Sequence, residues 1–558
     1  MLKNPSVKYR AFPQVPLHDR QWPEKTITKP PIWMSTDLRD GNQALFEPMN
    51  AERKLRMFEM LVKIGFKEIE AGFPSASDTD FGFIRKLVEG DYAGDDVKIE
   101  VLTQARPELI SRTMESLRGA KNAIVHVYNA TAPNFREVVF QQGKQGVKAI
   151  ATESAHQIKE IASTMPETNW TFQYSPEVFS GTELDFAKEV VDAVTEIWEA
   201  GPERKVVINL PATVEMATPN IYADQIEWMC RNLDNRENLI VSVHPHNDRG
   251  TGIAAAEMGV LAGADRIEGT LFGNGERTGN VDIVTLALNM FTQGVDPELD
   301  CSDIERIKAV YEYSNQMVIP ERHPYVGELV YTAFSGSHQD AINKGMKAIK
   351  VANKPQWEVP YLPIDPQDVG RTYEAIIRIN SQSGKGGIAY IMQSDYGINM
   401  PRALQVAFRE HVQKITDEEG RELPSKRIYD VFMEKYVEQP NGRIKFVDHQ
   451  TYPQGQAKGQ RVVTAEIEDN GVAKRIEAKG NGPVDGFINA LSDYLGIALS
   501  VEDYSEHSLN HGSDAKAIAY VEVAYDGGKI YGVGINTNIV AASLEAIVSA
   551  ANQILAAR

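Results

Sequence analysis

The feature of this sequence that most constrains its fold is an alternation, repeated eight times in about 270 residues, of a short apolar or β-branched run with a helical stretch. The predicted strands are residues 31–36, 66–71, 98–104, 122–128, 169–175, 205–210, 239–244 and 265–271. Eight such units are typical of a (β/α)₈ barrel, whereas a doubly wound open sheet usually has fewer strands. The sequence therefore predicts an α/β fold with an N-terminal TIM barrel, and the open sheet is the alternative.

The stretch at 50–65 illustrates the helical pattern, and Gly65 is placed to end it. One face carries Leu55, Phe58, Leu61 and Val62, and the opposite face carries Glu52, Arg56, Glu59 and Lys63.

Composition narrows the class of protein. The net charge of −19 disfavours binding to nucleic acid or to an anionic membrane. No run of 18 apolar residues occurs, and the first 25 residues lack the apolar segment of a secretory signal. Two cysteines, Cys230 and Cys301, exclude a disulfide framework or a Cys-rich zinc site. We therefore expect a soluble, cytoplasmic enzyme with no nucleic-acid or membrane partner.

At 558 residues the chain is too long for one hydrophobic core. We expect an N-terminal arm (1–25), a catalytic barrel (26–325), a linker of small helical subdomains (326–425) and a C-terminal α+β domain (426–558). The last part shows strands followed by a helix at 482–495, then further strands and a helix at 539–555.

Chemically useful side chains lie where predicted strands end, which in a barrel is the face that carries the active site. Strand one runs into Asp37, Arg39 and Asp40, which form either a structural ion pair or a metal ligand beside an electrophile. His244 and His246 leave strand seven two residues apart, so both imidazoles point the same way. With Asp40 they would suit Zn²⁺, Mn²⁺, Mg²⁺ or Fe²⁺; the alternative is a pair of unrelated loop histidines.

The remaining strand ends add polar groups. The Gly-rich loop at 272–280 lacks the dinucleotide-binding spacing, and a loop after strand eight often binds phosphate or carboxylate instead. Each of the other candidates alone is more often a satisfied polar group or a helix cap, so their convergence is the argument. They are His126, Ser175, Glu177, Asn209 and Thr213. In the Gly-rich loop itself, Glu276 and Arg277 can pair with neighbours and Asn280 can face the metal.

Two motifs, LRDGNQ (38–43) and VHPHNDRGTG (243–252), resemble those of the lyases and synthases that act on acyl-CoA thioesters and 2-oxo acids. Within that superfamily the chain is most similar to the 2-isopropylmalate synthases in their long bacterial form. The similarity covers nearly the whole chain and includes the segments at 209–220, 334–345, 359–371 and 381–392.

The resemblance implies roles for particular residues. Asp40, His244 and His246 match the metal ligands, with Asn280 close to the metal, and the ion would be Mg²⁺, Mn²⁺ or Zn²⁺, with K⁺ as a further activator. Arg39 would stabilise enolate charge, and Glu177 and His338 would deprotonate acetyl-CoA, with Tyr361 near the reacting centre. The residues around the 2-oxo acid, which would be 2-oxoisovalerate, are Gln43, His126, Ser175 and Thr213.

The resemblance also implies feedback inhibition by leucine at the C-terminal domain, in the first committed step of leucine biosynthesis. The helix that follows Gly480, Asn481, Gly482 and Pro483 offers N–H groups that bind carboxylates, and the alternative is a plain dimerisation domain. His338 and Tyr361 lie outside the barrel, so we expect a homodimer in which one linker covers the partner's site, with closure in cis as the alternative.

Three other functions stay open at this point. A sister synthase for homocitrate or citramalate would share the metal site, and a lyase would cleave instead of condensing. A non-catalytic paralogue would have lost a ligand residue.

Overall fold

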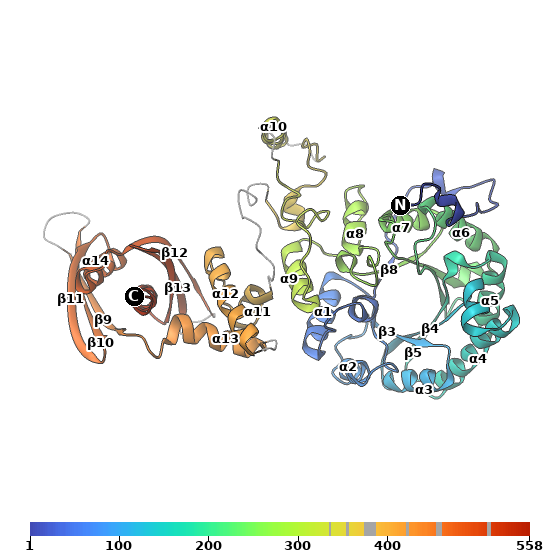
Figure 1. The fold of residues 1–558 in the computed structure, drawn as a ribbon, viewed down its shortest axis with the longest axis horizontal. Coiled ribbons are helices and arrows are strands. Elements are labelled where there is room, and N and C mark those ends of the chain that lie inside the picture. The colour runs from blue at the N-terminus through green and yellow to red at the C-terminus, as the bar shows by residue number, and fades with distance from the viewer. Residues whose placement is uncertain (334–335, 353–355, 373–386, 420–422, 454–459, 510–514) are drawn as a thin grey trace. The chain divides into compact units, whose positions relative to one another are not determined.

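A computed structural model gives the structure of the chain and describes all residues except 334–335, 353–355, 373–386, 420–422, 454–459 and 510–514 (Figure 1). By their internal contacts the residues form two compact units, Met1–Ser381 and Gln382–Arg558. This division falls inside the segment 326–425 that the sequence assigns to a linker, so the four domain boundaries stay a prediction. The segments expected at 334–345 and 381–392 lie partly outside the described residues.

The first unit contains a closed barrel of eight parallel strands in sequential order, which confirms the predicted (β/α)₈ fold and rejects the open sheet (Figure 1). The strands are β1 Ile32–Ser35, β2 Glu68–Gly72, β3 Lys98–Gln104, β4 Asn122–Ala130, β5 Asn169–Glu177, β6 Val206–Ala212, β7 Leu239–Pro245 and β8 Arg266–Gly269. The helices that follow them are α1 Ala51–Ile64, α2 Asp78–Glu89, α3 Pro107–Ser116, α4 Lys144–Ser163, α5 Leu184–Ile197, α6 Pro219–Asn232, α7 Gly252–Leu261 and α8 Ile283–Phe291.

Helix α1 begins and ends within one residue of the prediction, but its buried face differs. Phe58 and Leu61 are buried as expected, whereas Leu55 and Val62 are only half-buried. The buried face instead includes Lys54, whose ammonium pairs with Asp80 at 2.5 Å. Hydrophobic periodicity cannot predict a buried ion pair, because it assigns every lysine to the solvent-facing side of a helix.

The N-terminal segment lies along α6. Arg20 pairs with Asp224 through two nitrogens, and the backbone N–H of Trp22 donates to Glu227. Val15 and Leu17 pack with Ile221 of the same helix. The second half of the segment is therefore attached to the barrel by ion pairs and apolar contacts.

Three further elements follow the barrel among the described residues of the first unit. They are α9 Ile304–Asn315, α10 Gly336–Ala352 and the short 3₁₀ turn Pro366–Val369. Helix α9 packs on α1, where Arg53 donates to the carbonyl of Ser314 at 3.4 Å.

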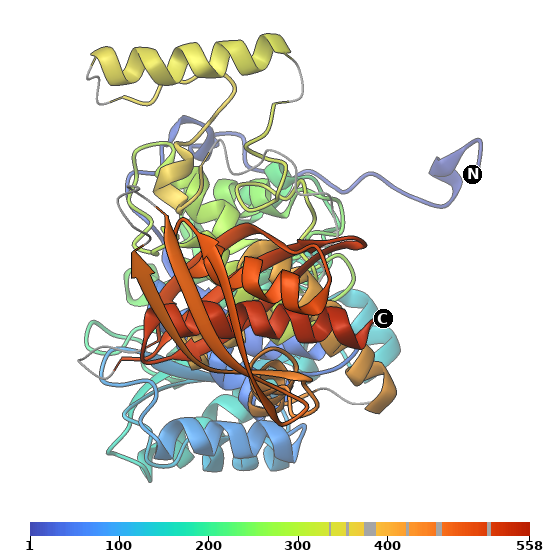
Figure 2. The same ribbon diagram turned by 90° about the vertical axis from the view of Figure 1, so that its left-hand side faces the viewer.

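The second unit begins with α11 Gly387–Tyr396, α12 Arg402–Glu419 and α13 Ser425–Phe432. Two similar antiparallel repeats of three strands and a helix follow. The first repeat is β9 Ile444–Pro453, β10 Arg461–Asp469, β11 Val472–Gly480 and α14 Pro483–Leu495; the second is β12 Ser500–Ser508, β13 Ala517–Tyr525, β14 Gly528–Asn536 and α15 Ile539–Ala556. Both repeats contribute to one core, which α15 crosses (Figure 2).

Among the described residues, α15 is the single helix whose length and composition would allow it to cross a membrane. The core helix of a folded domain passes the same test, and 67% of this helix is buried inside its own unit.

Candidate active site and metal centre

A cavity of about 240 Å³ opens at the carboxyl ends of the barrel strands. It brings together nine of the residues that the sequence singled out for chemistry: Arg39, Asp40, Gln43, His126, Ser175, Glu177, Thr213, His244 and His246. Asn209, Glu276 and Arg277 also line it. The carboxyl ends of six barrel strands, β1 and β4 to β8, thus contribute these residues to one pocket, as the barrel topology requires.

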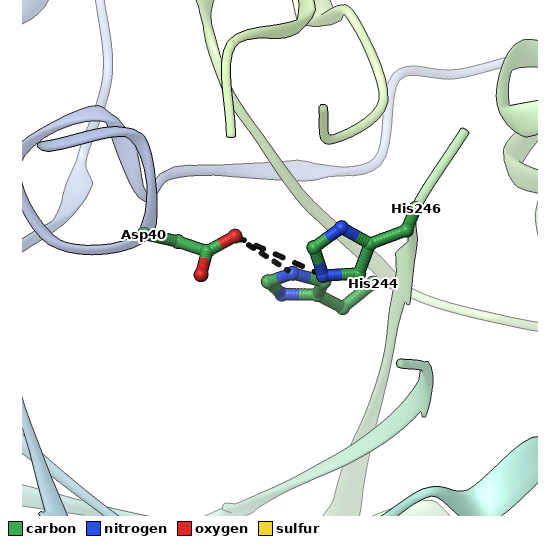
Figure 3. A group of neighbouring side chains, drawn as sticks. All are labelled: Asp40, His244 and His246. Atoms are coloured by element: carbon green, nitrogen blue, oxygen red, sulfur yellow. Dashed lines mark ion pairs between the residues drawn. The ribbon is translucent and has the colours of Figure 1, made fainter. Parts of the chain in front are cut away.

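Asp40, His244 and His246 form a compact group in this pocket (Figure 3). The Oδ2 atom of Asp40 lies 3.9 Å from Nε2 of His244 and 3.8 Å from Nε2 of His246. Asp40 sits on a single π-helical turn, Asp37–Gly41, directly after β1, and such turns are frequent at functional sites. One potential ligand atom of each residue lies within 4.8 Å of the others, so the three could hold a metal ion.

The electrostatics of the group favour a cation. Burial would raise the pKa of Asp40, but the positive charge of Arg39 and the neighbouring imidazoles lower it, so Asp40 is ionised. Burial and the charge of His244 lower the pKa of His246 to about 4, so its imidazole is neutral and free to ligate.

Two neighbours orient the potential ligands. Nδ1 of His244 lies 2.9 Å from Oε2 of Glu268, which directs the opposite nitrogen, Nε2, toward Asp40. The amide nitrogen of Asn280 donates to Oδ2 of Asp40 at 2.6 Å. The Oδ1 atom of Asn280 is buried, and no described residue donates a hydrogen bond to it. An unpaired oxygen beside two imidazoles and a carboxylate is a donor set that fits a divalent ion.

Arg39 occupies the wall beside the group. Its Nε donates to Oε2 of Glu70 at 2.6 Å, and its Nη1 donates to Oδ1 of Asp40 at 2.9 Å. Burial would lower the pKa of Arg39, but the charges of Glu70 and Asp40 raise it. The guanidinium is therefore a fixed positive charge at the pocket surface.

His126, Ser175 and Asn209 form a hydrogen-bonded chain across the pocket floor. Burial would lower the pKa of His126, but the carboxylates of Glu100 and Glu70 raise it to about 9. The imidazolium donates through Nε2 to the hydroxyl of Ser175 at 2.6 Å, and Asn209 donates to the same oxygen at 2.9 Å. With both acceptor positions filled, the Ser175 hydroxyl proton is available to a ligand oxygen.

Glu177 ends β5 at the opposite wall. Burial raises the pKa of its carboxyl, and the positive charge of Arg39 offsets part of that effect. No described residue donates a hydrogen bond to this carboxylate, in contrast to the paired carboxylates below it. A half-buried carboxylate of raised pKa that faces a pocket has the properties of a general base.

Sequence reasoning missed the acidic residues that hold this site from inside the barrel. Arg266, which is fully buried, pairs with Glu68, Glu100 and Glu268 at 2.5–2.6 Å. The signal was present, since a glutamate interrupts the apolar runs of the predicted strands at 66–71, 98–104 and 265–271. A charge in the middle of a buried strand needs a partner, and here Arg266 is paired with Glu268 of its own strand and with Glu68 and Glu100 of β2 and β3.

His338 and Tyr361 do not line the pocket. Their rings stack on each other with centroids 4.1 Å apart, and Tyr361 is 62% exposed. The structure therefore pairs these two predicted residues with each other and leaves them facing solvent in a single chain.

Comparison with known proteins covers the whole length of the chain. Residues 30–310 match the HMGL-like family, residues 328–393 match the alpha-isopropylmalate synthase post-catalytic domain, and residues 422–555 match the LeuA allosteric (dimerisation) domain. The chain is 71% identical over 550 residues to the 2-isopropylmalate synthase of Rhizobium johnstonii, covering 99% of this chain and 98% of that protein. It is 72% identical to that of Rhizobium meliloti, with the same coverage, and 69% identical to that of Agrobacterium fabrum, covering 99% of each.

The chain belongs to the 2-isopropylmalate synthase family.

Membership of the 2-isopropylmalate synthase family makes the chain an acyltransferase and decides between the open alternatives. The full-length match favours this family over the sister synthases. The presence of the post-catalytic and allosteric domains separates it from the shorter lyases, and no candidate ligand residue is missing.

The part of the chain that matches the LeuA allosteric (dimerisation) domain contains the predicted segment 480–483 at the start of α14. Gly480 is tightly enclosed, because an added Cβ would lie 2.3 Å from the nitrogen of Gly486. Gly482 is extended, with φ −171°, and an added Cβ there would meet no atom within 4 Å. The backbone before α14 therefore borders open space at Gly482.

Proposed function

We propose that the chain condenses acetyl-CoA with 2-oxoisovalerate and hydrolyses the thioester, giving 2-isopropylmalate and CoA. The proposal rests on one observation above the others: the convergence of Asp40, His244 and His246 in the mouth of the barrel of a chain that belongs to this family. Acetyl-CoA, 2-oxoisovalerate and water are consumed, and 2-isopropylmalate, CoA and a proton are formed.

Asp40, His244 and His246 would hold the divalent ion, Mg²⁺, Mn²⁺ or Zn²⁺, with the oxygen of Asn280 beside it. When bound, the ion supplies Lewis acidity to the oxygen atoms of the 2-oxo acid, which makes the ketone carbon electrophilic.

The chain's own residues would orient the 2-oxo acid. The Ser175 hydroxyl, held by His126 and Asn209, can donate to a substrate oxygen. Thr213, whose oxygen accepts from the N–H of Val178, and Gln43 stand on the rim where a carboxylate can reach them. This arrangement supports the assignment of all four predicted substrate-binding residues, including Gln43.

Proton removal from the acetyl methyl group requires a base and a positive charge near the thioester oxygen. Glu177 has the raised pKa and the lack of hydrogen-bond donors that suit a base or the partner of one. Arg39, held by Glu70, offsets the negative charge as the enolate forms. His338 and Tyr361 would join them from the linker of a second subunit, because in one chain they lie outside the pocket.

Leucine would act as the feedback inhibitor at the allosteric domain, at the segment Gly480–Pro483. Inhibition requires that leucine binds two states of the homodimer with different affinities. The cytoplasm is the compartment that suits the two free cysteines, Cys230 and Cys301.

The test is CoA release by the purified, metal-loaded protein, followed with a thiol reagent, with one 2-oxo acid at a time. We expect a preference for 2-oxoisovalerate, loss of activity with a chelator and reduction by leucine. Parallel assays in K⁺ and Na⁺ test the monovalent activator. A preference for pyruvate or 2-oxoglutarate would reassign the chain to a sister synthase, and no release with any 2-oxo acid would refute the condensation.

A further inference from the structure

A second cavity lies on the post-barrel segment, and none of the residues that line it has been assigned a role above. Helix α10 packs against the chain around Val359 and Pro360, since an added Cβ on Gly345 would lie 2.6 Å from Pro360. Ile342 is 1% exposed in this contact, and the His338–Tyr361 stack ties the start of the helix to the same loop. The helix and the loop therefore form a local body that carries the cavity.

The cavity has a volume of about 350 Å³ and lies between α10 and the turn at 366–369. Met346, Lys347 and Lys350 line it from α10, and Asp365 and Pro366 line it from the turn. Among the described residues no carboxylate forms an ion pair with Lys347 or Lys350, whereas Lys344, which does not line the cavity, pairs with Asp340 at 2.6 Å. Two uncompensated ammonium groups thus face the same space.

This set of groups has the chemistry of a nucleotide site. Ammonium groups bind phosphate as point charges, and a carboxylate beside them can accept hydrogen bonds from ribose hydroxyls. Asp365 is held for that role, since its Oδ1 accepts from the N–H of Gln367 at 3.0 Å. Met346 and Pro366 offer apolar surface for a base.

We propose that this cavity binds the 3′-phospho-ADP end of acetyl-CoA, an inference that rests on the proposed function. The helix connects the two ends of the co-substrate. At 1.5 Å per residue, Lys347 and Lys350 lie about 14 and 18 Å along α10 from His338, which is comparable to the length of an extended pantetheine arm. Around the helix, Lys350 lies about a third of a turn and Lys347 about half a turn from His338, so the ligand curves around α10 on its way to the reacting centre.

One segment would therefore deliver both ends of acetyl-CoA. His338 and Tyr361 would meet the thioester, while Lys347 and Lys350 hold the nucleotide. Because all four residues belong to the same body, they stay together whichever barrel mouth the segment covers.

The test compares the double variant Lys347→Ala/Lys350→Ala with Lys344→Ala in the full-length, metal-loaded enzyme. We expect the KM for acetyl-CoA to rise roughly tenfold in the double variant, with kcat and the KM for 2-oxoisovalerate within about twofold of wild type. Lys344→Ala removes one surface lysine that already has a partner and should leave all three constants unchanged. With acetyl-(3′-dephospho)-CoA, a smaller difference between wild type and double variant would assign the contact to the 3′-phosphate, and an equal difference would assign it to the diphosphate.

Two readouts separate this inference from the proposed function. An active wild type whose acetyl-CoA KM is the same in the double variant would overturn the cavity assignment and leave the reaction intact. If no 2-oxo acid gives CoA release, titration of wild type and double variant with 3′,5′-ADP by calorimetry still decides: binding weakened only in the double variant supports the site, and equal binding or none overturns it.

Discussion

Several polar side chains in the floor of the pocket are held by glutamates of other barrel strands. Arg39 and His126 share Glu70, His244 contacts Glu268, and Arg266 lies beneath them with three carboxylates. Buried charges of this kind are tolerated only when paired, because removal of one partner leaves the other as an uncompensated buried charge. The glutamates therefore position the side chains of the pocket and take no direct part in the reaction.

Replacing Glu268 with Gln should weaken metal binding. The carboxylate holds the Nδ1 proton of His244, and loss of its charge lowers the basicity of the opposite nitrogen. We expect the dissociation constant for the divalent ion to rise roughly tenfold, measured by competition with a chromophoric chelator.

Glu68→Gln is the matched control. It also removes a carboxylate from Arg266, but no described contact joins Glu68 to either histidine. If both variants lose metal affinity equally, the effect comes from Arg266 and the orientation of His244 by Glu268 is wrong.

His126 should make stability depend on pH. Its folded-state pKa of about 9 lies above the usual 6.5, so folding binds this proton more tightly. The contribution is fully present below about pH 6.5 and is lost as the pH rises through about 9. We expect the free energy of unfolding in urea to fall across that window in wild type and to fall less in His126→Gln. The same slope in both proteins would contradict a protonated His126.

The two histidines and Asp40 were predictable because strand periodicity and barrel topology decide where strand ends point. The buried ion pairs beneath them were not predictable, because a glutamate within an apolar strand does not indicate which residue of the barrel supplies its positive charge. Glu68 and Arg266, for example, lie in different strands, 198 positions apart.

At the scale of elements, all eight barrel strands were predicted to within about two residues, because buried parallel strands are continuous apolar runs. Strand β12, Ser500–Ser508, was missed. Its sequence SVEDYSEHS is mostly polar, and most of its residues are exposed at the edge of its sheet. Its extended conformation depends on pairing with β13, and the sequence of the segment alone does not predict that pairing.

At the start of α14, the proposed leucine site can be tested by a substitution that should not destabilise the fold. Gly482→Leu places a side chain in open space on an extended backbone that any residue adopts. If leucine binds there, we expect its inhibitory concentration to rise by roughly tenfold or more while activity without leucine is retained. Dose–response curves of CoA release against leucine measure this.

Gly480→Ala is the contrasting variant at the same segment. Its Cβ would lie 2.3 Å from the backbone of Gly486, so it should lower the thermal unfolding temperature, which Gly482→Leu should not. Unchanged leucine inhibition in a stable Gly482→Leu protein would move the effector site elsewhere.

For the whole molecule, the pocket contains the candidate metal ligands, Arg39 and Glu177, but lacks His338 and Tyr361. These two rings stack on each other at the surface of the same chain, and neither lines its pocket. A homodimer in which each linker covers the other barrel would complete two sites at once, as a two-fold axis requires.

Complementation between two inactive variants tests this assembly. Glu177→Ala damages the barrel side of the site, and His338→Ala damages the linker side. With differently tagged chains the mixed dimer can be purified from both parents and its mass checked by size exclusion. If the sites form across the interface, one site of the mixed dimer carries both defects and the other carries none, so about half of the wild-type CoA release should return. If each linker closes its own barrel, every site keeps one defect, and the mixed dimer should be as inactive as its parents.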